Sequence, residues 1–402
     1  MTEHPNGKEP ILLNDEIWEK VLKATDGAAW PCYQCGTCTA ACPWGRVRKE
    51  PLMVRSLIRN AQLGIDEESE MLWLCTSCGA CEAGCPRGVP IVQVLRALRS
   101  LAWKERRVPK GLSPVLWGMY QDGNPYCLPP SERSNWAKGL KLKPFQASDE
   151  VLLYVGCTGS YDRRIQKVAR AVVQLLEAAG VKFGTLGDAE PCCGESAMAM
   201  GQADYAAEIS KANSALFKEK GVKTLVAISP HCFDMFRNHM PKPHPDFEAL
   251  HYTQLLARLI ADGRLSFNGS FPKKVAFQDP CYLGRHNGEY DAPRKVLEAV
   301  PGLELSEMGE IKEESLCCGA GGGRMFLDTA AGERFSDIRV QHAAEAKAEV
   351  LSTACPFCVA CLEDSAAQTP GLEVMDVAEI AVAALGSGKK AAAKPAVAAG
   401  GR

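Results

Sequence analysis

Two closely spaced runs of cysteines near the N-terminus constrain this 402-residue chain more than any other feature. Each run has three cysteines separated by two residues, then a fourth after three more residues, and each is followed by proline. The first run is Cys32, Cys35, Cys38 and Cys42, and the second is Cys75, Cys78, Cys81 and Cys85. Three thiolates at this spacing can wrap one face of a metal centre, so the fourth has to come from elsewhere.

The spacing is that of the runs that hold cubane 4Fe-4S clusters in bacterial-type ferredoxins. In two-cluster ferredoxins the fourth cysteine of each run serves the other cluster. We therefore expect one cluster on Cys32, Cys35, Cys38 and Cys85, and a second on Cys75, Cys78, Cys81 and Cys42. Zinc also takes four cysteines, but zinc modules usually pair two C-x2-C knuckles and lack the proline-ended run. Apolar residues at helical spacing in 52–63 and 91–101 predict a mainly helical domain.

A second cysteine pattern occurs twice in the remainder of the chain, around two adjacent pairs that each precede a glycine. The offsets from Cys157 to Cys281, Cys192 to Cys317 and Cys232 to Cys355 are 124, 125 and 123 residues. These near-equal offsets indicate an internal duplication. Apolar segments at 151–155 and 274–278 predict strands, and 164–179, 205–220 and 250–262 predict helices that stop at glycine. Such alternation favours parallel sheets covered by helices on both faces, in halves related by a pseudo-twofold axis.

The predicted fold is therefore an α+β multidomain protein, with a helical ferredoxin-like domain followed by two α/β halves. All seven tryptophans lie before residue 145, which indicates a domain boundary there. The predicted units are an extension (1–29), the ferredoxin domain (30–108), an irregular proline-rich connector (109–149), the first half (150–265), the second half (266–385) and a disordered tail (386–402).

Composition excludes several classes of partner and location. The formal net charge of −2 indicates neither nucleic acid nor an anionic membrane. The sequence has no secretion signal and no apolar run of the roughly 18–20 residues that span a bilayer, so we expect a cytoplasmic protein without a membrane span of its own. Nineteen cysteines could indicate a disulfide-stapled secreted scaffold, but such scaffolds are short and carry a secretion signal, whereas this chain is long and has none. The cysteines are better interpreted as metal ligands.

The two halves differ in their cysteines. The second supplies five thiols, at Cys281, Cys317, Cys318, Cys355 and Cys358, which is more than a cubane needs and suits a larger or open cluster. The first supplies four, at Cys157, Cys192, Cys193 and Cys232, and in this alignment Met235 takes the place of Cys358. The first half either holds a four-thiolate cluster or is a degenerate copy, and the loss of only one ligand favours the cluster.

The glycines at 319 and 321–323 are expected to let backbone N–H groups approach sulfur. They lack the G-x-G-x-x-G spacing after a strand, which argues against a dinucleotide site. Of the remaining thiols, Cys127 is expected to be a small buried apolar residue, and Cys361 a non-ligating neighbour of the second set.

This arrangement resembles the cysteine-rich CCG domain of heterodisulfide reductases, here fused to two ferredoxin runs over residues 30–365. The resemblance implies that a complete motif binds a noncubane 4Fe-4S cluster through its five cysteines and acts on a disulfide. The catalytic set would then be Cys281, Cys317, Cys318, Cys355 and Cys358. The departure at Met235 puts a symmetrical partner cluster in doubt.

Two histidines adjoin the predicted ligands, since His231 precedes Cys232 and His286 follows Cys281 by five residues. Either is close enough along the chain to protonate a departing thiolate. The simpler interpretation, a histidine hydrogen-bonded to a loop carbonyl, is favoured for both.

The leading hypothesis is an iron–sulfur oxidoreductase subunit in which two cubanes serve a noncubane cluster that performs heterodisulfide or thiol redox chemistry. The alternative is a non-catalytic electron-transfer subunit of a flavin-dependent dehydrogenase or larger reductase complex. A structural zinc protein is a third, remote class. Because no flavin or nicotinamide motif is visible, the expected partners are a flavoprotein, a hydrogenase-type module or a membrane cytochrome, with a thiol or disulfide as substrate.

Overall fold

A computed structural model describes residues 14–50, 52–65 and 70–386. The N-terminal part is helical, as expected. It contains α1 (Glu16–Ala24), α2 (Thr37–Ala40), α3 (Trp44–Val47), α4 (Val54–Leu63), the 3-10 helix η1 (Glu70–Leu74), α5 (Ala80–Ala83) and α6 (Ile91–Lys104). The apolar face predicted for 52–63 is buried at Leu52, Ile58 and Ala61 but exposed at Met53, and the face predicted for 91–101 is buried at Val94 and Leu95. The predicted tail lies outside the described residues apart from residue 386, as do positions 1–13 of the predicted extension.

The segment predicted as an irregular connector contains a regular helix. Helix α7 (Leu112–Gln121) precedes the short 3-10 helices η2 (Pro130–Glu132) and η3 (Asn135–Ala137). The expectation of an irregular segment is wrong for α7, because Pro114 lies in the first turn of that helix, where a missing N–H group costs no helical hydrogen bond. The α7 side chains Leu112, Val115 and Met119 are buried.

Each half of the remainder contains a four-stranded parallel sheet, as predicted. The first has the order β2-β1-β3-β4 and the second β6-β5-β7-β8. The strands are β1 (Val151–Tyr154), β2 (Phe183–Gly184), β3 (Thr224–Ala227), β4 (Glu248–His251), β5 (Lys274–Gln278), β6 (Glu304–Leu305), β7 (Val350–Thr353) and β8 (Glu373–Asp376). Residues 250–251, predicted as helical, are the end of β4.

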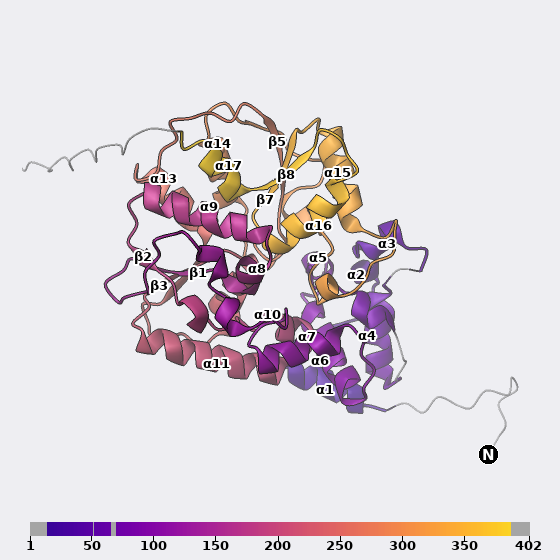
Figure 1. Ribbon diagram of the computed structural model, residues 1–402. Coiled ribbons are helices and arrows are strands. Elements are labelled where there is room, and N and C mark those ends of the chain that lie inside the picture. The colour runs from indigo at the N-terminus through magenta and orange to yellow at the C-terminus, as the bar shows by residue number, and fades with distance from the viewer. Residues whose placement is uncertain (1–13, 51, 66–69, 387–402) are drawn as a thin grey trace, which may run out of the picture.

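Helices connect the strands of each half. The first half contains α8 (Gly156–Tyr161), α9 (Ile165–Ala178), η4 (Gly187–Ala189), α10 (Glu195–Ala199), α11 (Ala203–Glu219), α12 (Pro230–Asp234), the π-helix η5 (Met235–His239) and α13 (Tyr252–Ala261). The second contains α14 (Asp291–Glu298), η6 (Lys312–Glu314), η7 (Arg324–Phe326), α15 (Phe335–Glu345), α16 (Pro356–Ala366) and α17 (Val377–Ala383). The crossover from β1 to β2 contains α9, and the crossover from β2 to β3 contains α11 and runs in the opposite direction across the sheet. Because such crossovers are right-handed, α9 and α11 lie on opposite faces of the first sheet (Figure 1).

The two halves pack through equivalent helices. Helix α9 contacts α17, and α13 contacts α14. Since α9 and α14 follow the first strand of their halves while α13 and α17 close them, each contact is the pseudo-twofold counterpart of the other. One apolar core runs through both halves and includes Val172 and Leu256 of the first and Leu297 and Ile380 of the second.

Arg99 of α6 joins all three parts of the molecule. Its buried guanidinium donates to the carbonyls of Leu72 and Cys75 in the N-terminal part, of Ala199 in the first half (2.7 Å) and of Gly322 in the second (2.9 Å). Buried carbonyls need partners, so this single side chain fixes the helical part against both halves.

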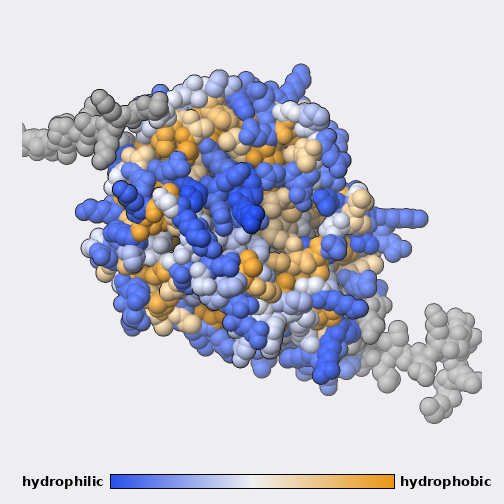
Figure 2. All heavy atoms as spheres, in the orientation of Figure 1, coloured by the Kyte–Doolittle hydropathy of each residue, from blue (hydrophilic) through white to orange (hydrophobic). Residues whose placement is uncertain are grey.

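The surface is of mixed polarity. The face in Figure 2 carries polar side chains interspersed with apolar ones. In the part of the chain that the structure describes, every helix is too short or too polar to cross a bilayer.

Candidate metal centres

The outer ferredoxin set forms a surface pocket. Cys32, Cys35, Cys38 and Cys85 line it together, which is the grouping expected when the fourth cysteine of each run is exchanged. Cys35 is exposed and the other three are partly buried. Gly36 between them has a φ of 91°, a conformation that an L side chain rarely adopts.

The inner ferredoxin set is more deeply placed. Cys75, Cys78 and Cys81 are buried, and Cys42 lies close enough to Cys75 and Cys78 that their charges add to burial in raising the pKa of its thiol to about 12. The Ser77 N–H group donates to the Cys75 Sγ atom over 3.4 Å. The structure thus brings together both exchanged sets that the run spacing predicts.

The five thiols of the second half also converge. Cys281 contacts Cys317, and the Cys318 and Cys358 Sγ atoms are 3.2 Å apart. Cys355 contacts Cys358. Burial raises the pKa of Cys355, but this contact helps to lower it to about 5. Every one of these side chains is at most 7% exposed, so the set is enclosed by protein.

The inner ferredoxin set and the second-half set touch each other. Contact with Cys317 is the largest cause of the raised pKa of Cys78, and the Cys317 Sγ atom lies 3.7 Å from the Thr76 Oγ1 atom. The glycines at 321 and 322 allow this approach, since a Cβ atom there would lie 2.3 Å from the Thr76 carbonyl oxygen and 2.1 Å from that of Cys75. These two glycines therefore serve domain contact rather than the expected N–H groups aimed at sulfur, whereas the Gly319 N–H group does donate to the Cys317 Sγ atom (3.3 Å).

The four thiols of the first half form a comparable chain of contacts. Cys157 contacts Cys192, and Cys193 contacts Cys232. The Arg133 Nη2 atom donates to the Cys157 Sγ atom over 3.2 Å, and Arg133 is paired in turn with the buried Glu190. A thiolate set here therefore has a buried guanidinium beside it.

The structure corrects the position at which the first half lacks a ligand. Ser229 caps α12 directly before Pro230, just as Cys355 caps α16 directly before Pro356. These pairs are 126 residues apart, as are the ends of β3 and β7. Cys232 contacts Cys193 as Cys358 contacts Cys318, so Cys232 is the counterpart of Cys358. The alignment of Met235 with Cys358 is wrong, because the cysteine offset of 123 does not follow the helix starts.

His286 has the structural role that the simpler interpretation gives it. Its Nε2 atom lies 2.8 Å from the Ser77 carbonyl oxygen, and burial lowers its pKa to about 4. A neutral ring that donates to this carbonyl fastens the second half to the inner ferredoxin loop.

His231 is different, because it bridges the two halves. Its Nδ1 atom lies 3.2 Å from the Glu195 Oε1 atom, its ring stacks on Tyr282 with centroids 3.9 Å apart, and its side chain contacts Cys355. Burial opposes protonation, but Glu195 and Cys355 outweigh it and raise the pKa of His231 to about 10. The residue that precedes Cys232 in the first half thus acts on a thiol of the second.

Two cysteines lie outside the four sets. The expectation that Cys127 is buried is wrong, since it is exposed and donates to the Pro114 carbonyl oxygen (3.3 Å). Its φ of 54° lies in the left-handed region, in the segment between α7 and η2. Cys361 is partly buried on α16.

The donor chemistry fits iron–sulfur clusters. Soft thiolates in sets of four or five, with backbone N–H groups donating to Cys75, Cys192 and Cys317, are what such clusters require. Within residues 14–50, 52–65 and 70–386, no three or more His, Cys, Asp or Glu side chains are arranged to hold a single metal ion.

Comparison with known proteins agrees with these sets. Residues 28–89 match the 4Fe-4S dicluster domain family, and residues 151–237 and 275–363 each match the cysteine-rich CCG domain family. The chain is 35% identical to the D component of the dihydromethanophenazine:CoB–CoM heterodisulfide reductase of Methanosarcina mazei, over 74% of each chain. It belongs to this family of CCG iron–sulfur oxidoreductases.

Two further relatives are longer. The chain is 34% identical to "Probable iron-sulfur-binding oxidoreductase FadF" of Bacillus subtilis, over 68% of this chain and 40% of the relative. It is 35% identical to "EtfAB:quinone oxidoreductase" of Syntrophomonas wolfei, over 72% of this chain and 43% of the relative. The chain therefore spans less than half the length of these two CCG proteins.

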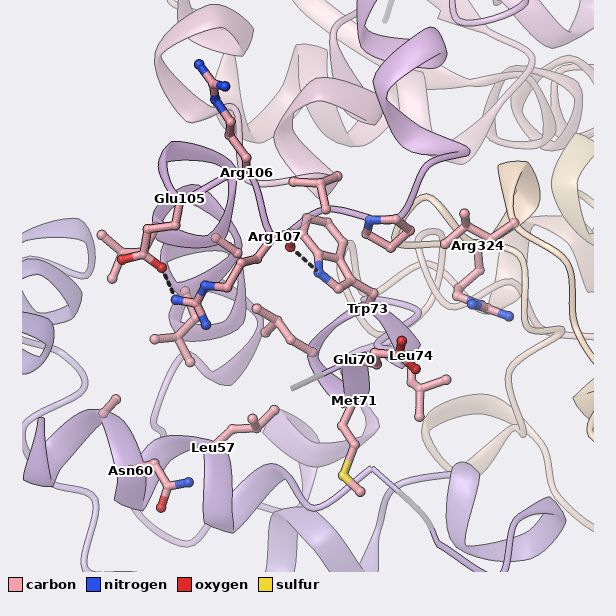
Figure 3. Close-up of a pocket in the computed structure, with 18 of the residues that line it drawn as sticks. Leu57, Asn60, Glu70, Met71, Trp73, Leu74, Glu105, Arg106, Arg107 and Arg324 are labelled. Atoms are coloured by element: carbon pink, nitrogen blue, oxygen red, sulfur yellow. Dashed lines mark hydrogen bonds and ion pairs between the residues drawn. The ribbon is translucent and has the colours of Figure 1, made fainter. Parts of the chain in front are cut away.

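A large cavity lies apart from the cysteine sets of this CCG protein. It has a volume of about 1130 Å³ and lies between the ferredoxin part and residues 324–333 of the second half. Figure 3 shows Trp73 and Leu74 on its wall, with Arg107 beside Glu105. Its cationic and acidic side chains are mixed, and no cysteine lines it.

Several residues at the CCG sets carry no signal in the sequence. Arg133 comes from the connector, and Glu195 and Tyr282 are ordinary residues in their segments. Only the fold brings them beside Cys157 and His231. The nearest sequence clue is position, because Glu195 follows the CCG triplet and Tyr282 follows Cys281.

Proposed function

We propose that this iron–sulfur oxidoreductase passes electrons between its surface and the five thiols of the second half, here called the second CCG set. The electrons pass through both ferredoxin sets. The observation that carries the proposal is the contact of Cys78 with Cys317, which joins the inner ferredoxin set to the second CCG set without intervening protein. The outer set lies in the same small domain as the inner set and reaches the surface at Cys35. Electrons entering from the surface then reach the outer set first, the inner set next and the second CCG set last.

The ligand assignments follow the convergence of the thiols. Two cubane 4Fe-4S clusters would be held by Cys32, Cys35, Cys38 and Cys85, and by Cys75, Cys78, Cys81 and Cys42. A noncubane cluster would be held by Cys281, Cys317, Cys318, Cys355 and Cys358, and a further cluster by Cys157, Cys192, Cys193 and Cys232. When bound, these groups accept and release single electrons.

At the second CCG set we propose thiol–disulfide redox chemistry. Reduction of a disulfide consumes two electrons and two protons and releases two thiols, so two single-electron deliveries support one turnover. The chain's own residues shape this site: Gly319 donates to Cys317, and His231, held by Glu195, contacts Cys355. Burial of all five side chains excludes bulk water.

A non-catalytic relay is the second candidate, and two observations favour it. The five thiols of the second set are enclosed, and Ser229 leaves the first set one thiol short of the five-cysteine pattern. A relay tolerates both features. The relative named an EtfAB:quinone oxidoreductase is consistent with such a component. A flavoprotein, hydrogenase-type module or membrane cytochrome would then be the partner, and we propose a cytoplasmic location.

Low-temperature electron paramagnetic resonance of anaerobically purified protein, oxidised with and without a simple thiol, separates the candidates. A paramagnetic signal that requires the thiol, and that disappears in Cys355→Ser, supports disulfide chemistry at the second set. If the iron content shows that the second set is loaded and the thiol changes nothing, the relay is the function. Protein that is colourless and contains zinc instead of iron would contradict both.

A further inference from the structure

The four cysteine sets differ in how they meet the surface. The inner ferredoxin set and both CCG sets are buried apart from the partly buried Cys42, whereas the outer set includes the exposed Cys35. Electron transfer to another protein needs close approach, and among the described residues of the four sets only Cys35 is exposed.

Large apolar side chains gather around that set. Trp30 is 70% exposed and lies two residues before Cys32, and Tyr33 is 60% exposed and contacts Cys35. Met53 is 37% exposed and directly precedes α4. In α4, the Arg55 N–H group donates to the side chain of Thr39, which lies between Cys38 and Cys42 in the first run. Exposed aromatic residues of this kind are enriched at protein interfaces.

The same surface carries positive charge without a counter-charge. Arg55 and Arg87 line the pocket with the four thiols and Tyr33, and both are exposed. Neither forms an ion pair with any residue that the structure describes. Residues 30–60 contain five lysines and arginines and one glutamate, and two of these cations, Arg46 and Arg48, pair with Glu310 and Glu333. We call Trp30, Tyr33, Met53, Arg55 and Arg87 the outer patch.

We propose that the outer patch is the docking surface for an acidic one-electron carrier protein, which exchanges single electrons with the outer ferredoxin set. The inference rests on the proposed electron path and adds its entry point and the charge of the partner. Trp30 and Tyr33 supply apolar contact, and Arg55 and Arg87 attract and orient a surface rich in Asp and Glu. One electron leaves the carrier's cofactor and is gained by the outer set, without transfer of a bond or a group.

The test uses an acidic flavodoxin as probe and the loaded full chain. Association of the oxidised proteins is measured by surface plasmon resonance, and electron transfer from reduced flavodoxin by stopped-flow absorbance, at low and at high ionic strength. In Arg55→Glu/Arg87→Glu we expect the association rate to fall by about tenfold or more at low salt, with the difference shrinking at high salt. Lys211→Glu/Lys242→Glu changes the net charge equally at exposed sites elsewhere and should alter the rate less than about twofold.

The apolar part of the patch is tested in the same assay. Trp30→Ala should raise the dissociation rate by about tenfold at every salt concentration, whereas Trp117→Ala, which removes an aromatic side chain that is 60% exposed on α7, should not. Equal binding by wild type and patch variants, or equal association of the basic carrier cytochrome c, would overturn the proposal.

A small reductant keeps this test independent of the electron path. Dithionite should reduce the patch variants as it reduces the wild type, because it needs no docking surface. Binding that depends on the outer patch while electrons stop at the ferredoxin sets would contradict the proposed path but leave the docking surface intact. Normal reduction of every set by dithionite without any patch dependence would do the reverse.

Discussion

The two CCG halves share one fold and yet offer different chemistry at the same position. After the third strand, the first half has Ser229, Pro230, His231 and Cys232, and the second has Cys355, Pro356, Phe357 and Cys358. Ser229 and Cys355 occupy equivalent N-cap positions, but only the Ser229 hydroxyl accepts a capping hydrogen bond, from the His231 N–H group. The histidine of the first half contacts Cys355 across the interface. The two copies of this fold therefore differ in their thiols, and the first copy places a histidine against a thiol of the second.

Exchanging the residues at the two N-cap positions, Cys355 and Ser229, should have the largest effect on the difference between the halves. Cys355→Ser gives the second half the four-thiol pattern of the first, and we expect its resonance signals to change and disulfide activity to fall by roughly 100-fold or more, because a hydroxyl is a poor substitute for a soft thiolate. Resonance spectra and iron per chain measure the change. Ser229→Cys is the matched control and should give the first half a fifth thiol and the resonance signals of the second. Wild-type signals in Cys355→Ser would show that the halves are not distinguished at this position.

Removal of the common anchor should affect both halves together. Arg99→Leu leaves the carbonyls of Ala199 and Gly322 without their partner, and we expect a loss of about 3–5 kcal/mol of stability, with a correspondingly lower thermal midpoint. Lys211→Leu on the exposed face of α11 is a surface control within about 0.5 kcal/mol of wild type. An unchanged midpoint would mean that the ferredoxin part docks through other contacts.

Replacing His231 by phenylalanine, the residue at the equivalent position 357, tests the contact of His231 with Cys355 across the interface. His231→Phe removes a polar contact to Cys355 while keeping an aromatic ring against Tyr282. We expect the one-electron midpoint potential of the second CCG set to fall by about 60 mV, which corresponds to about 1.4 kcal/mol. A redox titration followed by resonance spectroscopy measures the shift. His286→Gln, whose ring contacts the Ser77 carbonyl instead, should leave that potential and the pH profile unchanged.

The smallest effect concerns pH and the last strand of the first half. His251 is fully buried, and burial lowers its pKa to about 3. Because protonation is then possible only in the unfolded chain, His251 stabilises the fold above its ordinary pKa of about 6.5, and this stability is lost as pH falls from there towards 3. The free energies of unfolding at pH 7.5 and 5.5, measured by denaturant titration, should differ by about 1 kcal/mol more in wild type than in His251→Asn. Equal pH dependence in the two proteins would contradict this.

The features that depend on short-range spacing were predictable from the sequence. The ferredoxin runs specify both exchanged thiolate sets, because their spacing fixes a loop around a cluster. The strands at 151–155 and 274–278 were readable as short apolar segments, and the structure places β1 and β5 there. The missing ligand of the first half was harder, since the spacing of cysteines alone aligned Met235 with Cys358. Only the helix starts at Pro230 and Pro356 reveal that Ser229 is the altered position.

The amino-acid sequence was enough to predict which cysteines gather into four thiolate sets, since local spacing within a loop sets which sulfurs can share a centre. Tertiary packing then determined how the sets are connected. The contact of Cys78 with Cys317 depends on the glycines at 321–322 and on Arg99, residues far apart along the chain. The contact of His231 with Cys355 depends on the packing of two duplicated halves. Such contacts arise from domain packing over long sequence separations, which no local spacing encodes.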